Sequence, residues 1–308
     1  MMREPDNKQS GLLILAGLAA VLTAVVLIAV KLVAWLLTGS VSLLASLIDS
    51  LMDSLASLIN LLAIRYSLIP ADTEHRFGHG KAEALAGLGQ AVLITGSAGY
   101  LIYESTSKLL NPEPLTATGL GIAVMLFSTV VTIGLVALQR YVIRRTSSTA
   151  IEADSLHYVT DVAVNISVVL ALVAAHYGQH WVDGAVALAV AFYILSAALR
   201  IAWNSIQLLM DREVSEDVRT GITAIVARHP DVLGFHDLRT RQSGRTRFIQ
   251  LHVDMDENLP LREAHALGEE VEREIMASFA DVDVIIHLDP VVVVQRDEWA
   301  ERGQGIPE

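Results

Sequence analysis

Residues 42–60 read SLLASLIDSLMDSLASLIN, an apolar stretch that carries two aspartates four positions apart. On a helix, Asp49 and Asp53 project from the same face. Serine and asparagine recur on that face at three- and four-residue steps, so one polar stripe follows a helix otherwise built of Leu, Ile and Ala. About 20 apolar residues are enough to span a bilayer as a helix. The stretch therefore predicts a membrane-spanning helix with two carboxylates at membrane depth.

His157 and Asp161 form a second pair with the same spacing in another apolar segment. Ionisable side chains inside a bilayer are costly, and they usually face a protein partner, an ion path or a proton path. If the two polar stripes pack together, the four ionisable side chains surround one ion. The alternative is that small polar residues merely hold helices together. That alternative suits the serines of the stripe, whereas the four ionisable residues indicate a metal site.

The composition supports a membrane protein. The chain of 308 residues is 53% hydrophobic and only 18% charged, with a mean hydropathy of +0.47, which is too apolar for an ordinary soluble domain. Six stretches are nearly free of charge: residues 12–30, 43–64, 84–103, 115–139, 162–182 and 184–199. We therefore expect six transmembrane helices.

Basic residues orient the predicted bundle. They gather in the connections after the second and fourth spans, at Arg65, Arg76, Lys81, Arg140, Arg144 and Arg145. The alternate connections hold only Lys108. Because basic loops mark the cytoplasmic side, we expect a multi-pass protein with both termini in the cytoplasm.

The character of the chain changes at about Asp211. The remainder holds 11 Arg and 21 Asp or Glu and has no apolar run of membrane length, so it predicts a separate acidic domain. Its pattern predicts the order αββαβ, with helices at 216–228 and 261–279 and strands at 236–242, 246–255 and 282–288. A turn is expected at Ser243 and Gly244. The acidic balance argues against nucleic acid as a partner.

The fold class is thus an α-helical membrane protein, six transmembrane helices followed by a small cytoplasmic α/β domain. We expect four parts: a cytoplasmic N-terminal tail at 1–10, a transmembrane transport domain at 11–209, a cytoplasmic metal-binding domain at 210–295 and a flexible tail at 296–308.

The ligand types narrow the choice of ion. The chain has no cysteine, which excludes thiolate ligands and leaves oxygen and nitrogen donors. Three carboxylates with one imidazole suit tetrahedral zinc, with cadmium, ferrous iron and cobalt as alternatives and manganese less favoured. Without metal, the carboxylates need protons to offset their charge, and the imidazole must lose its proton to bind metal. Metal and protons therefore compete, which is the minimum requirement for antiport.

Several motifs together resemble the cation diffusion facilitator family. They are the two spaced pairs in the second and fifth spans, the loop DTEHRFGHGK at residues 72–81, the run HDLRTRQSG at residues 236–244, the six spans and the αββαβ tail. The resemblance covers about residues 11–295. It implies that the tail is a ferredoxin-like domain of metallochaperone type and that the protein is a homodimer.

The resemblance also implies three metal sites and one interface contact. The transport site falls on Asp49, Asp53, His157 and Asp161, the loop site on Asp72, His75 and His79, and the cytoplasmic site on His236, His252, His265, His287 and Asp289. The charge interlock at the dimer interface falls on Lys81 and Asp211. Without the resemblance, the loop residues would equally fit a polar turn, and each histidine of the tail would fit an ordinary surface position.

These features predict a proton-coupled exporter of divalent metal, working by alternating access in the bacterial inner membrane. Zinc is the expected cargo, with cadmium or ferrous iron as alternatives. A membrane-bound metal sensor is the competing hypothesis, but a sensor needs no ion site at membrane depth. We do not expect an enzyme, because the sequence contains no metal-hydrolase motif such as His-Glu-xx-His.

Overall fold

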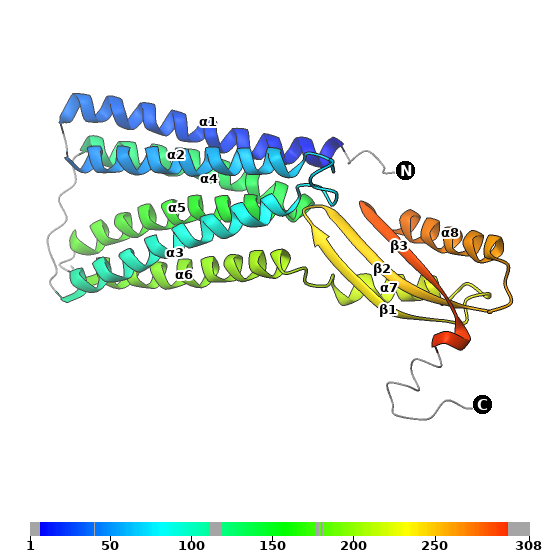
Figure 1. The fold of residues 1–308 in the computed structure, drawn as a ribbon. Helices are drawn as coiled ribbons and strands as arrows, with labels where there is room; N and C mark the ends of the chain where they lie inside the picture. Colours follow the sequence, from blue (N-terminus) through cyan, green and yellow to red (C-terminus); the bar gives the residue numbers. More distant parts are fainter. Residues whose placement is uncertain (1–6, 40, 111–118, 177–178, 180, 295–308) are drawn as a thin grey trace. The chain divides into compact units, whose positions relative to one another are not determined.

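A computed structural model of the chain describes residues 7–39, 41–110, 119–176, 179 and 181–294 (Figure 1). The chain divides into two compact units. One unit ends at Leu209, and the other begins at Met210. Each unit is described by itself below.

The first unit is a bundle of six helices, each 27 to 32 residues long (Figure 1). They are α1 (Asn7–Thr38), α2 (Val41–Ser67), α3 (Lys81–Leu110), α4 (Gly119–Thr146), α5 (Thr149–His176) and α6 (Trp181–Leu209). Five of them, α1, α2, α3, α4 and α6, are long and apolar enough to cross a membrane, judged on the described residues. The predicted fifth span at 162–182 includes positions 177, 178 and 180, which lie outside the described residues.

The fifth helix begins well before the charge-free stretch that indicated it. The apolar stretch begins at Val162, but α5 begins at Thr149. The hydroxyl of Ser148 accepts the backbone N–H of Ile151 at 3.2 Å and so caps the first turn. The first half of the helix carries ionisable residues, so a count of apolar residues alone does not reach its start, although the pair of His157 and Asp161 was assigned to this segment.

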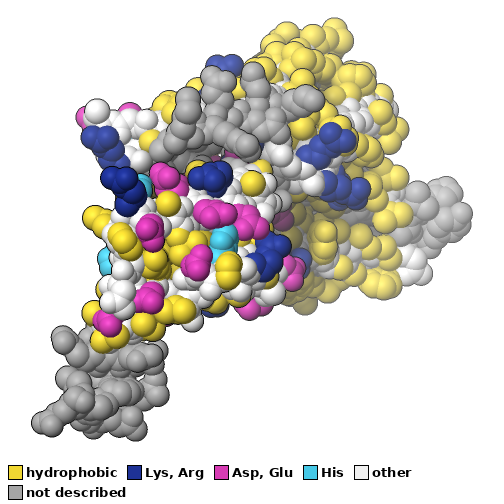
Figure 2. Space-filling view, turned by 90° about the vertical axis from the view of Figure 1, so that its right-hand side faces the viewer, with side chains coloured by type: hydrophobic (Ala, Val, Ile, Leu, Met, Phe, Trp, Pro, Cys, Tyr) yellow, Lys and Arg dark blue, Asp and Glu magenta, His cyan; other side chains and the backbone are white. Residues whose placement is uncertain are grey.

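The exterior of the bundle is hydrophobic. Large apolar side chains on several helices, such as Leu22, Leu36, Leu93 and Val130, are more than 60% exposed. In Figure 2, hydrophobic side chains dominate the bundle surface that is visible, whereas charged side chains gather on the second unit. An apolar exterior of this extent is what a lipid environment requires.

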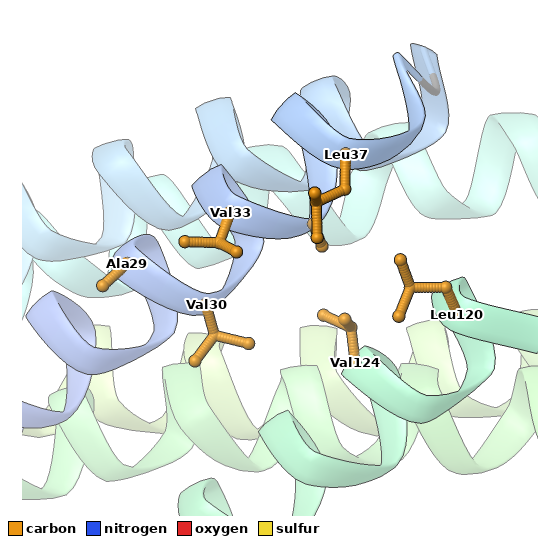
Figure 3. Close-up of a pocket in the computed structure, with 7 residues that line it drawn as sticks. Ala29, Val30, Val33, Leu37, Leu120 and Val124 are labelled. Carbon is orange, nitrogen blue, oxygen red and sulfur yellow. The ribbon is translucent and has the colours of Figure 1, made fainter.

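An apolar groove of about 380 Å³ lies between α1 and α4 (Figure 3). It is lined by Ala29, Val30, Val33, Ala34, Leu37, Leu120 and Val124. In Figure 3 the labelled side chains of α1 and α4 face each other across it. The lining contains no polar side chain, so the groove cannot hold an ion.

Helices α3 and α6 form the most extensive helix pair of the bundle. Their backbones approach closely at Gly184, where an added Cβ would lie 2.9 Å from both the carbonyl oxygen of Ser105 and the amide nitrogen of Leu109. Small residues at such contacts let membrane helices associate by close packing. Any side chain at position 184 would push the two helices apart.

The second unit confirms the predicted order αββαβ. It contains α7 (Glu216–Val226), β1 (Gly234–Ser243), β2 (Thr246–Met255), α8 (Leu261–Ser278) and β3 (Val282–Pro290). The sheet has the order β1-β2-β3, with β1 antiparallel and β3 parallel to the central β2. The predicted turn lies one residue later than expected: Ser243 ends β1, and Gly244, with a φ of +57°, and Arg245 connect it to β2.

The alternation along β2 separates a core face from a polar face. Ile249, Leu251, Val253 and Met255 are buried in one cluster with apolar residues of α7, α8 and β3. The intervening positions, including His252, project from the opposite face. The helices therefore cover one side of the sheet, and the histidines lie on the other.

Candidate metal-binding sites

Three of the four residues predicted to form the transport site come together where α2 meets α5. The Nε2 atom of His157 lies 2.8 Å from Oδ1 of Asp53, although the two residues are 104 positions apart. Ligand atoms of Asp53, His157 and Asp161 all lie within 4.8 Å of one another. One ion of about 2 Å ligand distance fits such a group.

Asp49 lies outside this three-residue group. It is on the same face of α2, one turn from Asp53, and its side chain is exposed in the single chain. The structure thus brings three of the four predicted ligands together and leaves the fourth one helical turn away.

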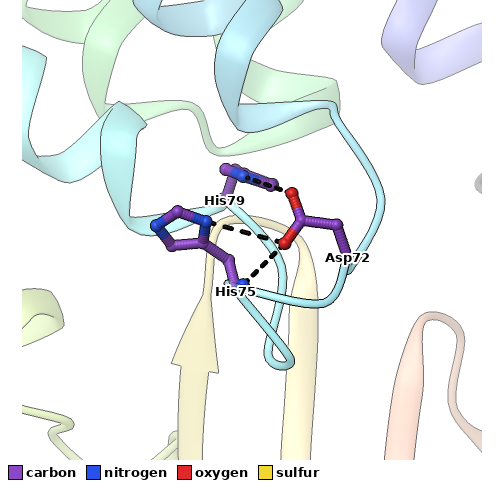
Figure 4. A group of neighbouring side chains, drawn as sticks. All are labelled: Asp72, His75 and His79. Atoms are coloured by element: carbon purple, nitrogen blue, oxygen red, sulfur yellow. Dashed lines mark hydrogen bonds and ion pairs between the residues drawn. The ribbon is translucent and has the colours of Figure 1, made fainter.

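The loop site is formed by the segment between α2 and α3 (Figure 4). The side chain of Asp72 accepts the backbone N–H groups of His75 at 2.6 Å and Glu74 at 2.9 Å. Both histidines also face this carboxylate, His79 at 3.4 Å and His75 at 3.7 Å. The backbone N–H of His75, followed by other interactions, lowers the pKa of Asp72 below its ordinary value. The carboxylate is therefore ionised and available to a cation at neutral pH.

The hydrogen bonds of His79 define its tautomer. Its Nδ1 lies 3.3 Å from the carbonyl oxygen of Ile69, which can only accept, so Nδ1 carries the proton. The Nε2 atom is left to face Asp72. This is the arrangement in which a backbone carbonyl orients an imidazole for metal binding. The His79 side chain is almost fully buried, whereas His75 and Asp72 are half-exposed, so a metal ion could enter from solvent.

The cytoplasmic-site histidines form a row across the sheet. His236 of β1 pairs with His252 of β2, which pairs with His287 of β3. The ring centroids are 4.9 Å and 4.6 Å apart along this row. The sheet register, and nothing in the local sequence, is what aligns them.

Asp289 joins this row of histidines. Its carboxylate lies 2.6 Å from Nδ1 of His252, 2.9 Å from Nδ1 of His287 and 3.7 Å from Nε2 of His236. Partial burial acts to raise the pKa of Asp289, and the hydrogen bonds with His252 and His287 act to lower it. The hydrogen bonds have the larger effect together, so the pKa lies below its ordinary value. The ligand atoms of His236, His252 and Asp289 lie within 4.8 Å of one another.

His265 does not join the cytoplasmic cluster within one chain. It lies on α8, its side chain is 71% exposed, and its Nε2 is 3.5 Å from the carboxylate of Glu269 one turn later. Since the helices cover the other face of the sheet, His265 and the row of histidines lie on different surfaces of this unit.

Lys81 and Asp211, the predicted interlock, each have contacts within their own unit. The Nζ of Lys81 donates to the carbonyl oxygen of Leu209 at 3.2 Å, at the end of α6. Asp211 adopts a φ of +57° and lies 3.5 Å from Nη1 of Arg241. Lys81 thus interacts with the carbonyl end of a helix, where a cation is favourable.

Comparison with known proteins gives the family. The model of the cation efflux transmembrane domain matches residues 17–210, and the model of the cation efflux protein cytoplasmic domain matches residues 214–291. The chain belongs to the cation efflux family, the cation diffusion facilitators.

Several curated members of the cation efflux family are similar over nearly their whole length. The cation-efflux pump FieF of Cronobacter sakazakii is 51% identical over 281 residues, 91% of this chain and 94% of that protein. FieF of Yersinia enterocolitica is 49% identical over 295 residues, 96% of this chain and 98% of that protein. The solved metal-bound C-terminal domain of the CzcD transporter from Thermotoga maritima is 30% identical, covering 24% of this chain and 88% of that domain, with a TM-score of 0.24.

A buried hub that the sequence interpretation did not recognise lies beside the candidate transport site. The Asp154 side chain on α5 is fully buried. Its carboxylate accepts hydrogen bonds from Ser57 of α2 at 3.0 Å, Gln90 of α3 at 3.0 Å and Gln139 of α4 at 2.6 Å. The hub thus ties four helices together about one turn from His157. Its signal in the sequence was weak, since glutamines in an apolar stretch have many other uses.

Two further residues beside the candidate metal sites were not singled out from the sequence. Asp254 on β2 lies 2.9 Å from Nδ1 of His236, and the alternation of β2 could have indicated it, since it follows His252 by two positions. Lys31 on α1 contacts α2 beside Asp49. The sequence could have indicated Lys31, because a lysine inside an apolar stretch of membrane length is rare and usually functional.

Proposed function

We propose that this protein exports divalent metal ions from the cytoplasm in exchange for protons, with zinc as the main cargo and cadmium or ferrous iron as further cargoes. The observation that carries the proposal is the hydrogen bond between Nε2 of His157 and Oδ1 of Asp53. Such a bond contains a proton, and the same two atoms are needed by a metal ion. Metal and proton therefore exclude each other at one site.

The choice of cargo rests on the ligand set. Asp53, Asp161 and His157 supply two carboxylates and one imidazole, and Asp49 is the candidate for a fourth ligand. A mixed oxygen and nitrogen set with four positions suits zinc better than magnesium or calcium, which take six or more oxygens. Cadmium and ferrous iron accept the same donors.

Transport requires that the site opens to one side at a time. In the proposed cycle, metal binds from the cytoplasm, the helices rock, and protons from the far side displace the metal. The hub of Asp154 keeps α2 and α5 in register, so both halves of the site move as one group.

The protein is proposed to work as a homodimer in the bacterial inner membrane, with both termini in the cytoplasm. The basic connections after the second and fourth spans support this orientation. Lys81 and Asp211 are proposed to form the charge interlock at the dimer interface. The groove between α1 and α4 is lined only by apolar side chains, which suits a lipid acyl chain.

The other two sites are proposed to bind metal without lying on the transport route. Metal bound by His236, His252, His287 and Asp289 would favour one geometry of the dimer. His265 would join this site only if it came from the partner subunit or if the domain rearranged. Asp72, His75 and His79 would bind a further ion between α2 and α3. The boundary between bundle and cytoplasmic domain is proposed at residues 209–210. The predicted tail at 296–308 lies outside the described residues, and α1 begins at Asn7, within the predicted tail at 1–10.

A sensor that binds but does not transport would use the cytoplasmic site alone. The sensor hypothesis does not explain why an imidazole and two carboxylates lie within 4.8 Å of one another on helices of membrane length.

The decisive experiment is metal flux into proteoliposomes. Zinc, cadmium, ferrous iron and manganese are supplied in parallel under a set pH gradient, with Asp53→Ala as the inactive control. We expect zinc flux that collapses when the pH gradient is removed. Zinc binding without flux would favour the sensor, and flux that is independent of the gradient would refute proton coupling.

A further inference from the structure

Lys31 is a cationic side chain on α1 that reaches the transport helix α2. Its Nζ donates to the hydroxyl of Ser50 at 2.6 Å and to the carbonyl oxygen of Ser46 at 3.2 Å. Both acceptors belong to α2, and Ser50 directly follows Asp49. The ammonium group is therefore held on the helix that carries two of the candidate ligands.

The depth of Lys31 matches that of Asp49. Lys31 lies about 10 Å before the end of α1, and Asp49 lies about 12 Å after the start of α2, at a rise of 1.5 Å per residue. These helix ends are joined by residues 39 and 40, on the side of the bundle opposite the loop site. An interior lysine is costly at this depth, so its cost must be offset by anionic or hydrogen-bonding partners.

The two residues of α2 that accept from the ammonium group flank Asp49, which lies three positions after Ser46 and directly before Ser50. Asp49 is also the candidate ligand that stays outside the group formed by Asp53, His157 and Asp161. At this point along α2, the carboxylate that lies outside the three-residue group is next to an ammonium group held in place from α1. A mere packing role would not require a cation here, because a serine or threonine can join two helices at lower cost.

We propose that Lys31 is a tethered counter-ion that competes with the metal for Asp49. While the site is empty, the ammonium group offsets the negative charge of Asp49. When metal binds, Asp49 becomes the fourth ligand, and the repulsion between the metal ion and the nearby ammonium group weakens metal binding. Lys31 is then a positioning residue that prevents the metal from being trapped and favours its release on the far side. The inference deepens the proposed function and rests on it.

The test compares Lys31→Met, which keeps the length of the side chain without its charge, with Lys31→Arg, which keeps the charge. Both are made in full-length protein carrying Asp72→Ala and His252→Ala, so that zinc binding reports on the transport site. We expect Lys31→Met to bind zinc at least about tenfold more tightly and to show a lower maximal flux in proteoliposomes, with a lower KM. Lys31→Arg should stay close to the parent in both measurements.

A double-mutant cycle tests whether the effect runs through Asp49. In the background Asp49→Asn, the change Lys31→Met should alter zinc affinity by less than about twofold. An unchanged affinity in folded Lys31→Met protein would overturn the proposal, as would equal effects of Met and Arg or full additivity with Asp49→Asn. If Lys31→Met protein does not fold, Lys31→Gln is measured by the same criteria. An absence of zinc flux in the unsubstituted protein would instead refute the proposed function and leave the binding result standing.

Discussion

The imidazole of His157 and the carboxylate of Asp53 are joined by a hydrogen bond of 2.8 Å between Nε2 and Oδ1. The bond connects α5 to α2, and Asp161 lies within reach of both groups. Both atoms of this bond can also coordinate a metal ion, because an imidazole nitrogen and a carboxylate oxygen bind metal once the proton between them is lost.

Loss of either central carboxylate should stop transport. We expect Asp53→Ala and Asp161→Ala each to reduce zinc flux at least about a hundredfold, since even residues that only support a metal ligand cost up to that much. Oligomer size by gel filtration serves as the control for folding and assembly. Flux near the unsubstituted rate in either variant would contradict the assignment of the site.

Replacing the nitrogen ligand should change which ion is carried. His157→Asp gives an all-oxygen set, which favours the harder manganese ion over zinc. We expect the ratio of manganese to zinc flux to rise by about tenfold or more in a competition assay. An unchanged ratio would mean that nitrogen ligation does not determine selectivity.

The Asp154 hub should matter more for stability than for metal binding. Asp154→Leu leaves Ser57, Gln90 and Gln139 without their buried acceptor, which we expect to cost about 3 kcal/mol or more. Asp154→Asn keeps the shape and one acceptor oxygen and should cost less. Thermal unfolding of the purified protein compares the two variants, and equal midpoints would show that the hydrogen bonds to the carboxylate contribute little.

The carboxylate of Asp72 has two separable roles in the loop. Asp72→Asn retains an oxygen for the backbone N–H groups of His75 and Glu74 but loses the charge, whereas Asp72→Ala loses both. We expect Asn to abolish metal binding while preserving the loop, and Ala to loosen the loop as well. Hydrogen exchange at His75 distinguishes them, and equal protection in both variants would contradict the turn.

The pH dependence of this loop follows from the sign of the pKa shift. The pKa of Asp72 is lower in the folded protein than its ordinary value. Its stabilisation of the loop is therefore complete above the ordinary value of about 3.9 and is lost only as the pH falls through the lower, folded value. Loop protection in metal-free protein should thus be equal at pH 5 and pH 7. A marked loss at pH 5 would contradict the assignment.

The cytoplasmic site should modulate transport without being required for it. Ala at both His236 and His287 removes two members of the row joined by Asp289. We expect tight zinc binding to the cytoplasmic domain to be lost and flux to fall by less than about tenfold, because the transport ligands are untouched. Gln at His265, which is exposed on α8, is compared in the same assays, and weaker zinc binding there would show that His265 joins the site in the dimer. Complete loss of flux in dimeric protein would make the cytoplasmic site obligatory.

The sequence by itself determined the architecture. Apolar stretches of membrane length predict helices because the bilayer leaves the backbone no other partner for its hydrogen bonds. The alternation of Ile249, Leu251, Val253 and Met255 with polar residues predicted which face of β2 is buried, and the structure confirms it. The pairs Asp49 with Asp53 and His157 with Asp161 could be selected because ionisable residues are rare in such stretches.

Only the tertiary structure decided which of these residues meet. That Asp53 contacts His157 while Asp49 stays apart depends on the rotation of α2 against α5, and helix periodicity cannot fix that rotation. The convergence of three polar side chains on Asp154 and the approach of Lys31 to Ser50 depend equally on neighbours distant in the chain. The row of His236, His252 and His287 depends on strand register, since a slip of one residue would turn these side chains to the other face.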